Sequence, residues 1–266
     1  MPDVDGARRD LVSWRWRQTR DALAADTGIN IPMGKSMSLR HVATIVVWVA
    51  LASACVAENP PPAAPALEIV ADVPDTVDPA ARYLFYLHGA IIERAGERPT
   101  HPVFGVYEYR KILETFADRG LIVISEARPA GTEASEYAAK VAQQVRTLLA
   151  AGVPPDHVTV VGFSKGGGIA ILASSLLADD DLNFAFLAAC GPWLDAHPEV
   201  IPRGRLLALR EASDDLVTSC GELFSRSPGS SERRELVLEL GGGHGAFYRP
   251  HPEWVDPVVE WAMASE

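Results

Sequence analysis

A serine between two glycines is the first candidate for chemistry in this sequence. Ser164 stands in the stretch Gly-Phe-Ser-Lys-Gly at 162–166, between an apolar run at 157–161 and a helical pattern at 167–178. A G-x-S-x-G pattern at a strand-to-helix junction holds the serine on a sharp turn with its hydroxyl exposed. Glycine is needed on both sides, because a Cβ would clash with neighbouring backbone in so tight a turn. The pattern predicts a nucleophilic serine at the head of a helix.

A serine hydroxyl becomes a nucleophile when a base accepts its proton and an acid orients that base. His244 is the candidate base, because it lies in the glycine-rich stretch 241–245 after an apolar run. Asp214 and Asp215 are the candidate acids, and they follow another apolar run at 206–209. The expected chemistry is acyl transfer, and it needs no cofactor and no metal ion.

These residues follow apolar runs that alternate with helical patterns. Nearly continuous apolar runs are typical of strands buried on both faces of a parallel sheet. The alternation predicts an α/β fold, a three-layer α/β/α sandwich with a mostly parallel sheet, in which ligands gather at the carboxyl ends of strands. The expected strands are 83–87, 121–124, 157–161, 184–188, 206–209 and 235–240, with an edge strand beginning at 68–70; the expected helices are 109–119, 135–151, 167–178 and 254–263.

From about residue 82 to 264 the chain resembles the α/β-hydrolase superfamily, through the serine turn and the order serine, aspartate, histidine. In that family the acid often stands in a G-x-x-D-x-x-V pattern. Asp214 matches this frame with a valine three residues later, although Glu211 occupies the glycine position. Asp215 would place Thr218 at the valine position. The resemblance favours Asp214.

The same resemblance implies an oxyanion hole made of backbone amides. In the family a His-Gly element after a strand supplies one N–H group, and the residue after the serine supplies the other. Here His88 and Gly89 follow the run 83–87, which implicates the amide of Ala90 (or that of the next residue) and the amide of Lys165. His88 itself is interpreted as a structural histidine.

Two segments could shape the substrate site. The stretch 191–203 is short, which predicts little or no lid and argues against a dedicated long-chain lipase. The longer insertion at 91–107 carries Glu93 among other polar residues, and Arg128 could join it. This insertion is either a solvated loop or a polar wall that selects the substrate.

The N-terminal part predicts export. A 16-residue apolar run at 42–57 follows basic residues and contains Ala-Ser-Ala-Cys at 52–55, near its end. This layout is typical of a signal peptide, and its end resembles a lipobox that would lipidate Cys55. Plain cleavage and secretion, or a short membrane anchor, are the alternatives. We expect an exported protein, either a periplasmic or membrane-anchored lipoprotein or a secreted one.

These features divide the chain into four parts. Residues 1–36 are interpreted as a non-native extension from a misassigned start, or else as a cytoplasmic tail. Residues 37–54 are the expected signal peptide, and 55–66 a Pro-rich linker. The expected α/β-hydrolase domain is 67–266, which is long enough for one sizeable core.

Composition narrows the function further. The 24 Lys and Arg residues against 35 Asp and Glu residues give a net charge of −11, which argues against nucleic-acid binding. Three cysteines are too few for a disulfide scaffold or a Cys-rich zinc module. In an oxidising compartment Cys190 and Cys220 could form a disulfide, and two buried thiols are the alternative.

The sequence thus predicts an exported serine hydrolase with a small-molecule substrate, most simply a carboxylesterase on small soluble esters. A thioesterase or a peptidase would use the same three residues, Ser164, Asp214 and His244. A surface-tethered binding protein on a hydrolase scaffold, without turnover, is the alternative from another class.

Overall fold

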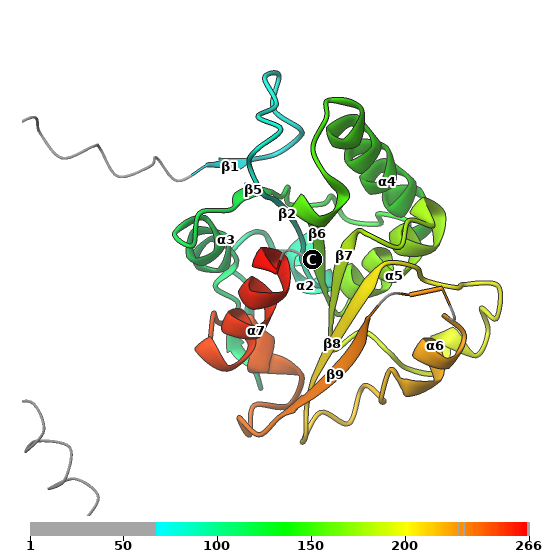
Figure 1. The fold of residues 1–266 in the computed structure, drawn as a ribbon. Coiled ribbons are helices and arrows are strands. Elements are labelled where there is room, and N and C mark those ends of the chain that lie inside the picture. The colour runs from blue at the N-terminus through cyan, green and yellow to red at the C-terminus, as the bar shows by residue number, and fades with distance from the viewer. Residues whose placement is uncertain (1–67, 228, 231, 265–266) are drawn as a thin grey trace, which may run out of the picture. The chain divides into compact units, whose positions relative to one another are not determined.

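A seven-stranded parallel sheet forms the centre of the computed structural model, which describes residues 68–227, 229–230 and 232–264 (Figure 1). Every neighbouring pair of strands in this sheet runs parallel, as expected from the apolar runs. In spatial order the strands are β1 (Ile69–Val70), β5 (Ile122–Ile124), β2 (Tyr83–Leu87), β6 (Val158–Phe163), β7 (Asn183–Leu187), β8 (Arg205–Glu211) and β9 (Arg233–Leu238).

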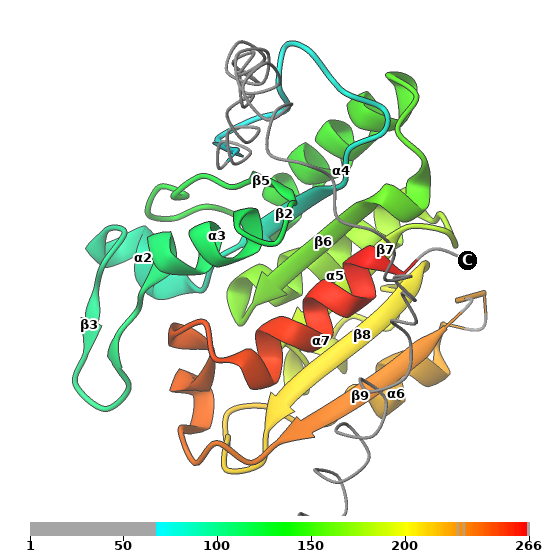
Figure 2. The same ribbon diagram turned by 60° about the vertical axis from the view of Figure 1, so that its left-hand side comes forward.

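Helices cover both faces of the sheet and make a three-layer α/β/α sandwich. Helices α3 (Tyr109–Ala117) and α7 (Pro252–Met263) lie on one face, and α4 (Ala134–Ala150) and α5 (Lys165–Leu177) on the other (Figure 2). Side chains alternate along each strand, so Leu84 and Tyr86 of β2 belong to the core under α3 and α7, whereas Tyr83 and Phe85 belong to the core under α4 and α5. The shorter helices are α2 (Ala90–Ala95) and α6 (Gly221–Ser225).

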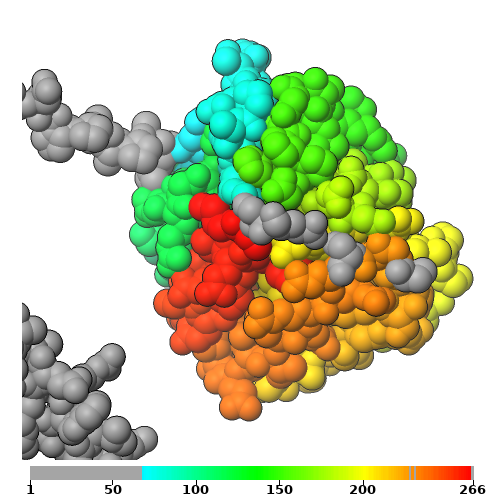
Figure 3. All heavy atoms as spheres, viewed as in Figure 1, coloured from blue at the N-terminus to red at the C-terminus, as the bar shows by residue number. Residues whose placement is uncertain are grey.

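The two edge strands differ from the central ones. The short strand expected at 68–70 is β1, which pairs with β5. In β9 only Leu238 is buried, so the expectation that the run 235–240 is covered on both faces was wrong. The orange segment that contains β9 lies at the surface (Figure 3), and its outer edge pairs with no strand among the described residues.

The insertion at 91–107 is structured. It begins with α2 and continues as an antiparallel hairpin of β3 (Thr100–His101) and β4 (Gly105–Val106). Ile92 and Tyr107 are buried and residues 94–98 are exposed, so the segment is a partly solvated insertion with its own helix and hairpin. Strands β3 and β4 have two residues each, and the segment mixes polar and apolar residues. Hydrophobic periodicity therefore does not predict these elements.

The N-terminal expectations lie outside the described residues. They concern the extension 1–36, the signal peptide 37–54, the linker 55–66 and lipidation at Cys55. Within the described part of the chain, no helix is both long and apolar enough to span a bilayer.

Candidate active site

Ser164 lies on the turn between β6 and α5 with φ 53° and ψ −118°. This left-handed conformation is rare for a residue with a side chain and is found where a site holds it in place. A Cβ at Gly162 would overlap the carbonyl of Gly166, and a Cβ at Gly166 would overlap the carbonyl of Leu87. The predicted need for glycine on both sides of the serine is therefore confirmed.

The structure brings Ser164, His244 and Asp214 into one hydrogen-bonded chain. The Ser164 hydroxyl lies 2.8 Å from His244 Nε2, and His244 Nδ1 lies 2.7 Å from Asp214 Oδ2. A carboxylate only accepts, so Nδ1 donates to Asp214, and Nε2 is left to accept from the serine hydroxyl. The Asp214 side chain is fully buried and that of His244 is 12% exposed, whereas Asp215 is exposed.

A buried carboxylate joins the loops that carry Asp214 and His244. Glu211 accepts hydrogen bonds from the backbone of Ser213 at 2.7 Å and of Gly241 at 2.9 Å, and also from the Ser213 hydroxyl. Burial alone would raise the pKa of Glu211, but these hydrogen bonds lower it below its ordinary value. Glu211, the residue that departed from the family frame, therefore ties the acid loop to the histidine loop.

The β3–β4 hairpin packs over the histidine loop. The Phe104 ring centroid lies 6.3 Å from that of His244, and a Cβ at Gly245 would come within 2.5 Å of Phe104 Cβ. This close approach explains why residue 245 lacks a side chain. Part of the insertion after the oxyanion element thus supports the base.

The two candidate oxyanion residues each begin a helix next to Ser164. Ala90 is the first residue of α2 and Lys165 is the first residue of α5. Neither backbone N–H group has an acceptor among the described residues, as expected for the first turn of a helix. A Cβ at Gly89 would lie 3.7 Å from Ser164 Cβ, so the segment before α2 reaches the serine.

A cluster of charges lies next to these two residues. Arg128 was expected to join the insertion that carries Glu93, but the contact of Glu93 with Lys165 was not predicted from the sequence. Glu93 of α2 contacts Lys165 Nζ at 2.6 Å and Arg128 Nε at 3.0 Å. The Glu93 side chain is 5% exposed and that of Arg128 is fully buried. Burial alone would raise the pKa of Glu93, but hydrogen bonds from the two cations lower it below its ordinary value.

His88 belongs to the same buried region and is neutral. Its Nε2 accepts a 2.8 Å hydrogen bond from the backbone N–H of Arg128, and its Nδ1 lies 2.9 Å from the Gly89 carbonyl. Burial, with a further contribution from the nearby Arg128 charge, lowers the pKa of His88 to about 3. These contacts agree with the interpretation of His88 as structural.

A cavity of about 800 Å³ opens beside Ser164 and His244. Its walls are largely apolar, with Leu172, Trp193 and Val217 among them, and Glu133 and Glu199 also line it. The short segment at 191–203 contributes a 3-10 turn, Pro192–Leu194, and the Trp193 indole donates to the Ala189 carbonyl at 2.9 Å. This segment forms one wall of the cavity.

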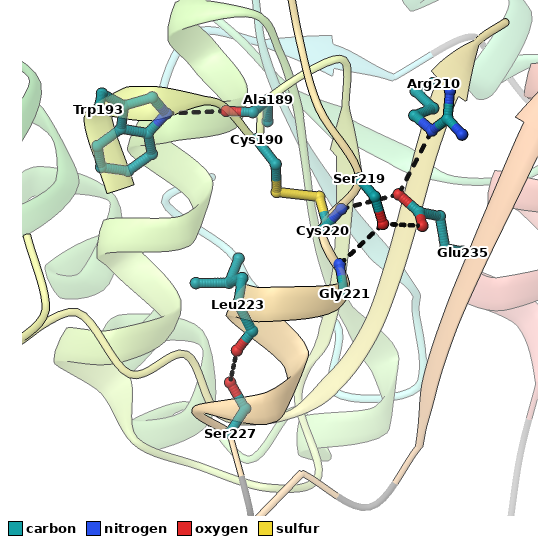
Figure 4. The surroundings of a disulfide bond; sticks show 10 residues. All are labelled: Ala189, Cys190, Trp193, Arg210, Ser219, Cys220, Gly221, Leu223, Ser227 and Glu235. Carbon is teal, nitrogen blue, oxygen red and sulfur yellow. Dashed lines mark hydrogen bonds and ion pairs between the residues drawn. A yellow bond between two sulfur atoms is a disulfide. The ribbon is translucent and has the colours of Figure 1, made fainter. Parts of the chain in front are cut away.

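A disulfide joins Cys190 to Cys220 (Figure 4). Cys190 lines the cavity, and its carbonyl accepts a 2.9 Å hydrogen bond from Thr218. On the other side of the bond, the Cys220 amide donates to Glu235 of β9 at 2.8 Å. The disulfide therefore anchors the loop after β8, which carries Asp214, to the cavity wall. No group of three His, Cys, Asp or Glu side chains suited to a metal ion occurs in the described part of the chain.

The parallel sheet, the covering helices and the strand–serine–helix turn define the α/β-hydrolase fold. No protein-family model and no curated protein matches the sequence. Among solved structures, SOBER1 of Arabidopsis thaliana is 12% identical, covering 70% of this chain and 100% of its own, with a TM-score of 0.46. A CIB-like hydrolase of Thermoplasma acidophilum is 19% identical, covering 70% and 88%, with a TM-score of 0.47. The butyrate-bound esterase Est2 of Thermogutta terrifontis is 17% identical, covering 71% and 84%, with a TM-score of 0.44.

Proposed function

We propose that the chain is a serine hydrolase that transfers an acyl group to water, acting as a carboxylesterase on small soluble esters. The observation that carries this proposal is the continuous hydrogen-bonded chain from Ser164 through His244 to Asp214, with 2.8 and 2.7 Å contacts. The strained backbone of Ser164 adds to it, because strain of this kind persists where function requires it.

The proposed reaction follows from this geometry. His244 Nε2 takes the hydroxyl proton as Ser164 Oγ attacks the carbonyl carbon, and Asp214 stabilises the imidazolium that forms. The amides of Ala90 and Lys165 donate to the oxygen that becomes negative in the tetrahedral intermediate. Collapse of the intermediate breaks the ester bond, and His244 returns the proton to the leaving alcohol. Water, activated by the same histidine, then releases the acid.

The substrate is proposed from the cavity. Its apolar walls suit a small ester with an uncharged hydrocarbon or aromatic group, which Trp193 and Leu172 would contact. Thioesters and peptides react by the same steps, so substrate panels must separate these classes. A matched set of one acyl group as ester, thioester and anilide tests this, and preference for the anilide would contradict the esterase proposal.

The proposed location is outside the cytoplasm, with a lipid tether at Cys55. The Cys190–Cys220 disulfide supports it, because such bonds persist mainly in oxidising compartments. Metabolic labelling with a palmitate analogue tests the tether: the full chain should be tagged, and Cys55→Ser should lose the tag. An untagged full chain would contradict lipidation and leave plain secretion.

Labelling with a fluorophosphonate tests the catalytic proposal without knowledge of the substrate. The full chain should form one adduct at Ser164, mapped by mass spectrometry, and Ser164→Ala should form none. His244→Ala should suppress labelling, whereas His251→Ala, a change at a histidine of the same C-terminal region outside the cavity, should not. A folded protein that is not labelled would contradict the hydrolase proposal and favour a binding protein.

A further inference from the structure

Two helices that begin at the candidate oxyanion residues are joined by an ion pair. Ala90 begins α2 and Lys165 begins α5, and Glu93 lies one turn into α2. The Glu93 carboxylate reaches across to the Lys165 ammonium, with Oε2 and Nζ 2.6 Å apart. Lys165 Nζ also donates to the Thr132 carbonyl at 2.6 Å. The side chain of Lys165 therefore links its own helix to the helix that presents the other amide.

Arg128 connects α2 to the segment that precedes it in the chain. Its Nε donates to Glu93 Oε1 at 3.0 Å, and its Nη2 donates to the backbone carbonyl of His88. The backbone N–H of Arg128 donates to His88 Nε2 at 2.8 Å. The chain on both sides of the Gly89–Ala90 peptide is thereby held by one fully buried guanidinium.

The cluster carries more positive than negative charge. Arg128 and Lys165 share one carboxylate, that of Glu93. Among the described residues, neither cation forms an ion pair with any other carboxylate. His88 is neutral at physiological pH. One net positive charge is therefore left beside the two helix starts, where the Lys165 side chain is 26% exposed and lines the cavity, and it would attract a negative oxygen there.

We propose that Glu93, Arg128 and Lys165 are the positioning residues of the oxyanion hole. In this view the cluster fixes the distance between the amides of Ala90 and Lys165, and its net charge favours the negative oxygen of the tetrahedral intermediate. The inference rests on the proposed function. It assigns a role to the side chain of Lys165 in addition to that of its backbone.

Lys165→Met is the sharpest test, because it keeps the backbone amide and removes only the ammonium. Glu93 retains Arg128 as partner, so no buried charge is left alone. We expect kcat for an activated ester to fall roughly tenfold or more with KM within about twofold, since small displacements of aligned groups cost this much. Affinity for a trifluoromethyl ketone, whose adduct carries the tetrahedral oxyanion, should fall by the same factor as kcat/KM.

Two further variants separate positioning from folding. Lys165→Arg keeps a cation that can reach Glu93 and should recover most of the rate. Glu93→Gln removes the negative charge and one of the two acceptor oxygens. The double variant with Lys165→Met should lose less than the product of the two single effects, because both break one cluster. The melting temperature of each variant shows whether it folds.

Lys140→Met is the matched control. Lys140 forms an ion pair with Glu126 away from the cavity, so kinetics should stay at the wild-type level. If the wild type labels at Ser164 and Lys165→Met matches it in kcat, the positioning role is wrong while the hydrolase proposal stands. A rise in KM alone would also overturn it, because Lys165 would then act by contacting substrate. Failure of the wild type to label or turn over would instead refute the proposed function.

Discussion

On one side of Ser164, α2 and the segment before it are held by buried charges. On the other side, the loops that carry Asp214 and His244 are held by a disulfide and by carboxylates that accept backbone hydrogen bonds. On the first side Glu93 is 5% exposed and Arg128 is fully buried, whereas Lys165 is 26% exposed where it lines the cavity. The second side includes exposed loop residues such as Leu216, which is 61% exposed.

The difference follows from the screening of charge. An ion pair in a dry region interacts strongly, whereas an exposed pair adds little to stability because water and salt screen it. A covalent bond does not depend on the local dielectric, so the buried disulfide can hold a loop that also carries exposed residues. The charged side should lose stability or activity when one of its groups is removed or protonated. The cross-linked side should lose stability when the disulfide is lost.

The largest expected effect lies on the cross-linked side, at Asp214. Asp214→Asn should lower kcat by about 10⁴-fold, because the amide can no longer hold His244 in the tautomer that accepts the serine proton. Asp215→Asn is the matched control and should keep kcat within about twofold. Steady-state kinetics on an activated ester measures both, and a larger loss in Asp215→Asn would reverse the assignment.

On the charged side, Arg128→Met should cost about 3–5 kcal/mol of unfolding free energy, the range for breaking a buried ion pair. Arg119→Met removes an exposed pair with Asp256 and should cost at most about 1 kcal/mol. Urea unfolding followed by tryptophan fluorescence measures both. Equal losses in the two variants would contradict the contrast between the buried cluster and the exposed surface.

Loss of the disulfide should cost slightly less. Cys190 and Cys220 are 30 residues apart, and closing a loop of that length restrains the unfolded chain by about 3–4 kcal/mol. Replacing both cysteines with alanine should lower the unfolding free energy by this amount. The wild type treated with a reductant is the comparison, and a stability unchanged by either treatment would show that the bond does not anchor the acid loop.

The smallest effect should appear on mild acidification, between about pH 6.5 and 5, and should come from the charged side. The pKa of His88 is about 3 in the folded protein, whereas that of an unfolded histidine is about 6.5. The unfolded chain therefore binds the extra proton first, and the stability that neutral His88 contributes is complete above about pH 6.5. It is lost as the pH falls toward 3, by roughly 1.4 kcal/mol per pH unit at most.

His88→Gln tests this dependence, because glutamine has no titrating group. Its unfolding free energy should fall less steeply than that of the wild type between about pH 6.5 and 5. Glu211→Gln is the comparison on the other side. The pKa of Glu211 lies below its ordinary value, so its contribution is present above the carboxyl range and is lost only at lower pH. Identical slopes in His88→Gln and the wild type would contradict the assignment to His88.

Local patterns were sufficient to predict the serine turn and most of the sheet. Glycine at 162 and 166 is required by steric contacts within a few residues, and buried strands appear as apolar runs because both of their faces are covered. The edge strand β9 was misjudged because its run includes apolar residues that remain partly exposed. Choosing Asp214 over Asp215 needed the family frame, since two adjacent carboxylates differ little in local pattern.

The α/β layering, the turn that carries Ser164 and the order of the residues that follow it could be predicted from the sequence alone. These depend on interactions among neighbours along the chain and on the apolar character of each run. The contacts of Glu93 with Arg128, 35 residues away, and with Lys165, 72 residues away, form only in the folded chain. A charged residue has the same appearance in a sequence whether it is solvated or paired. Its burial depends on which distant segments the sheet brings together, and that is a property of the folded chain.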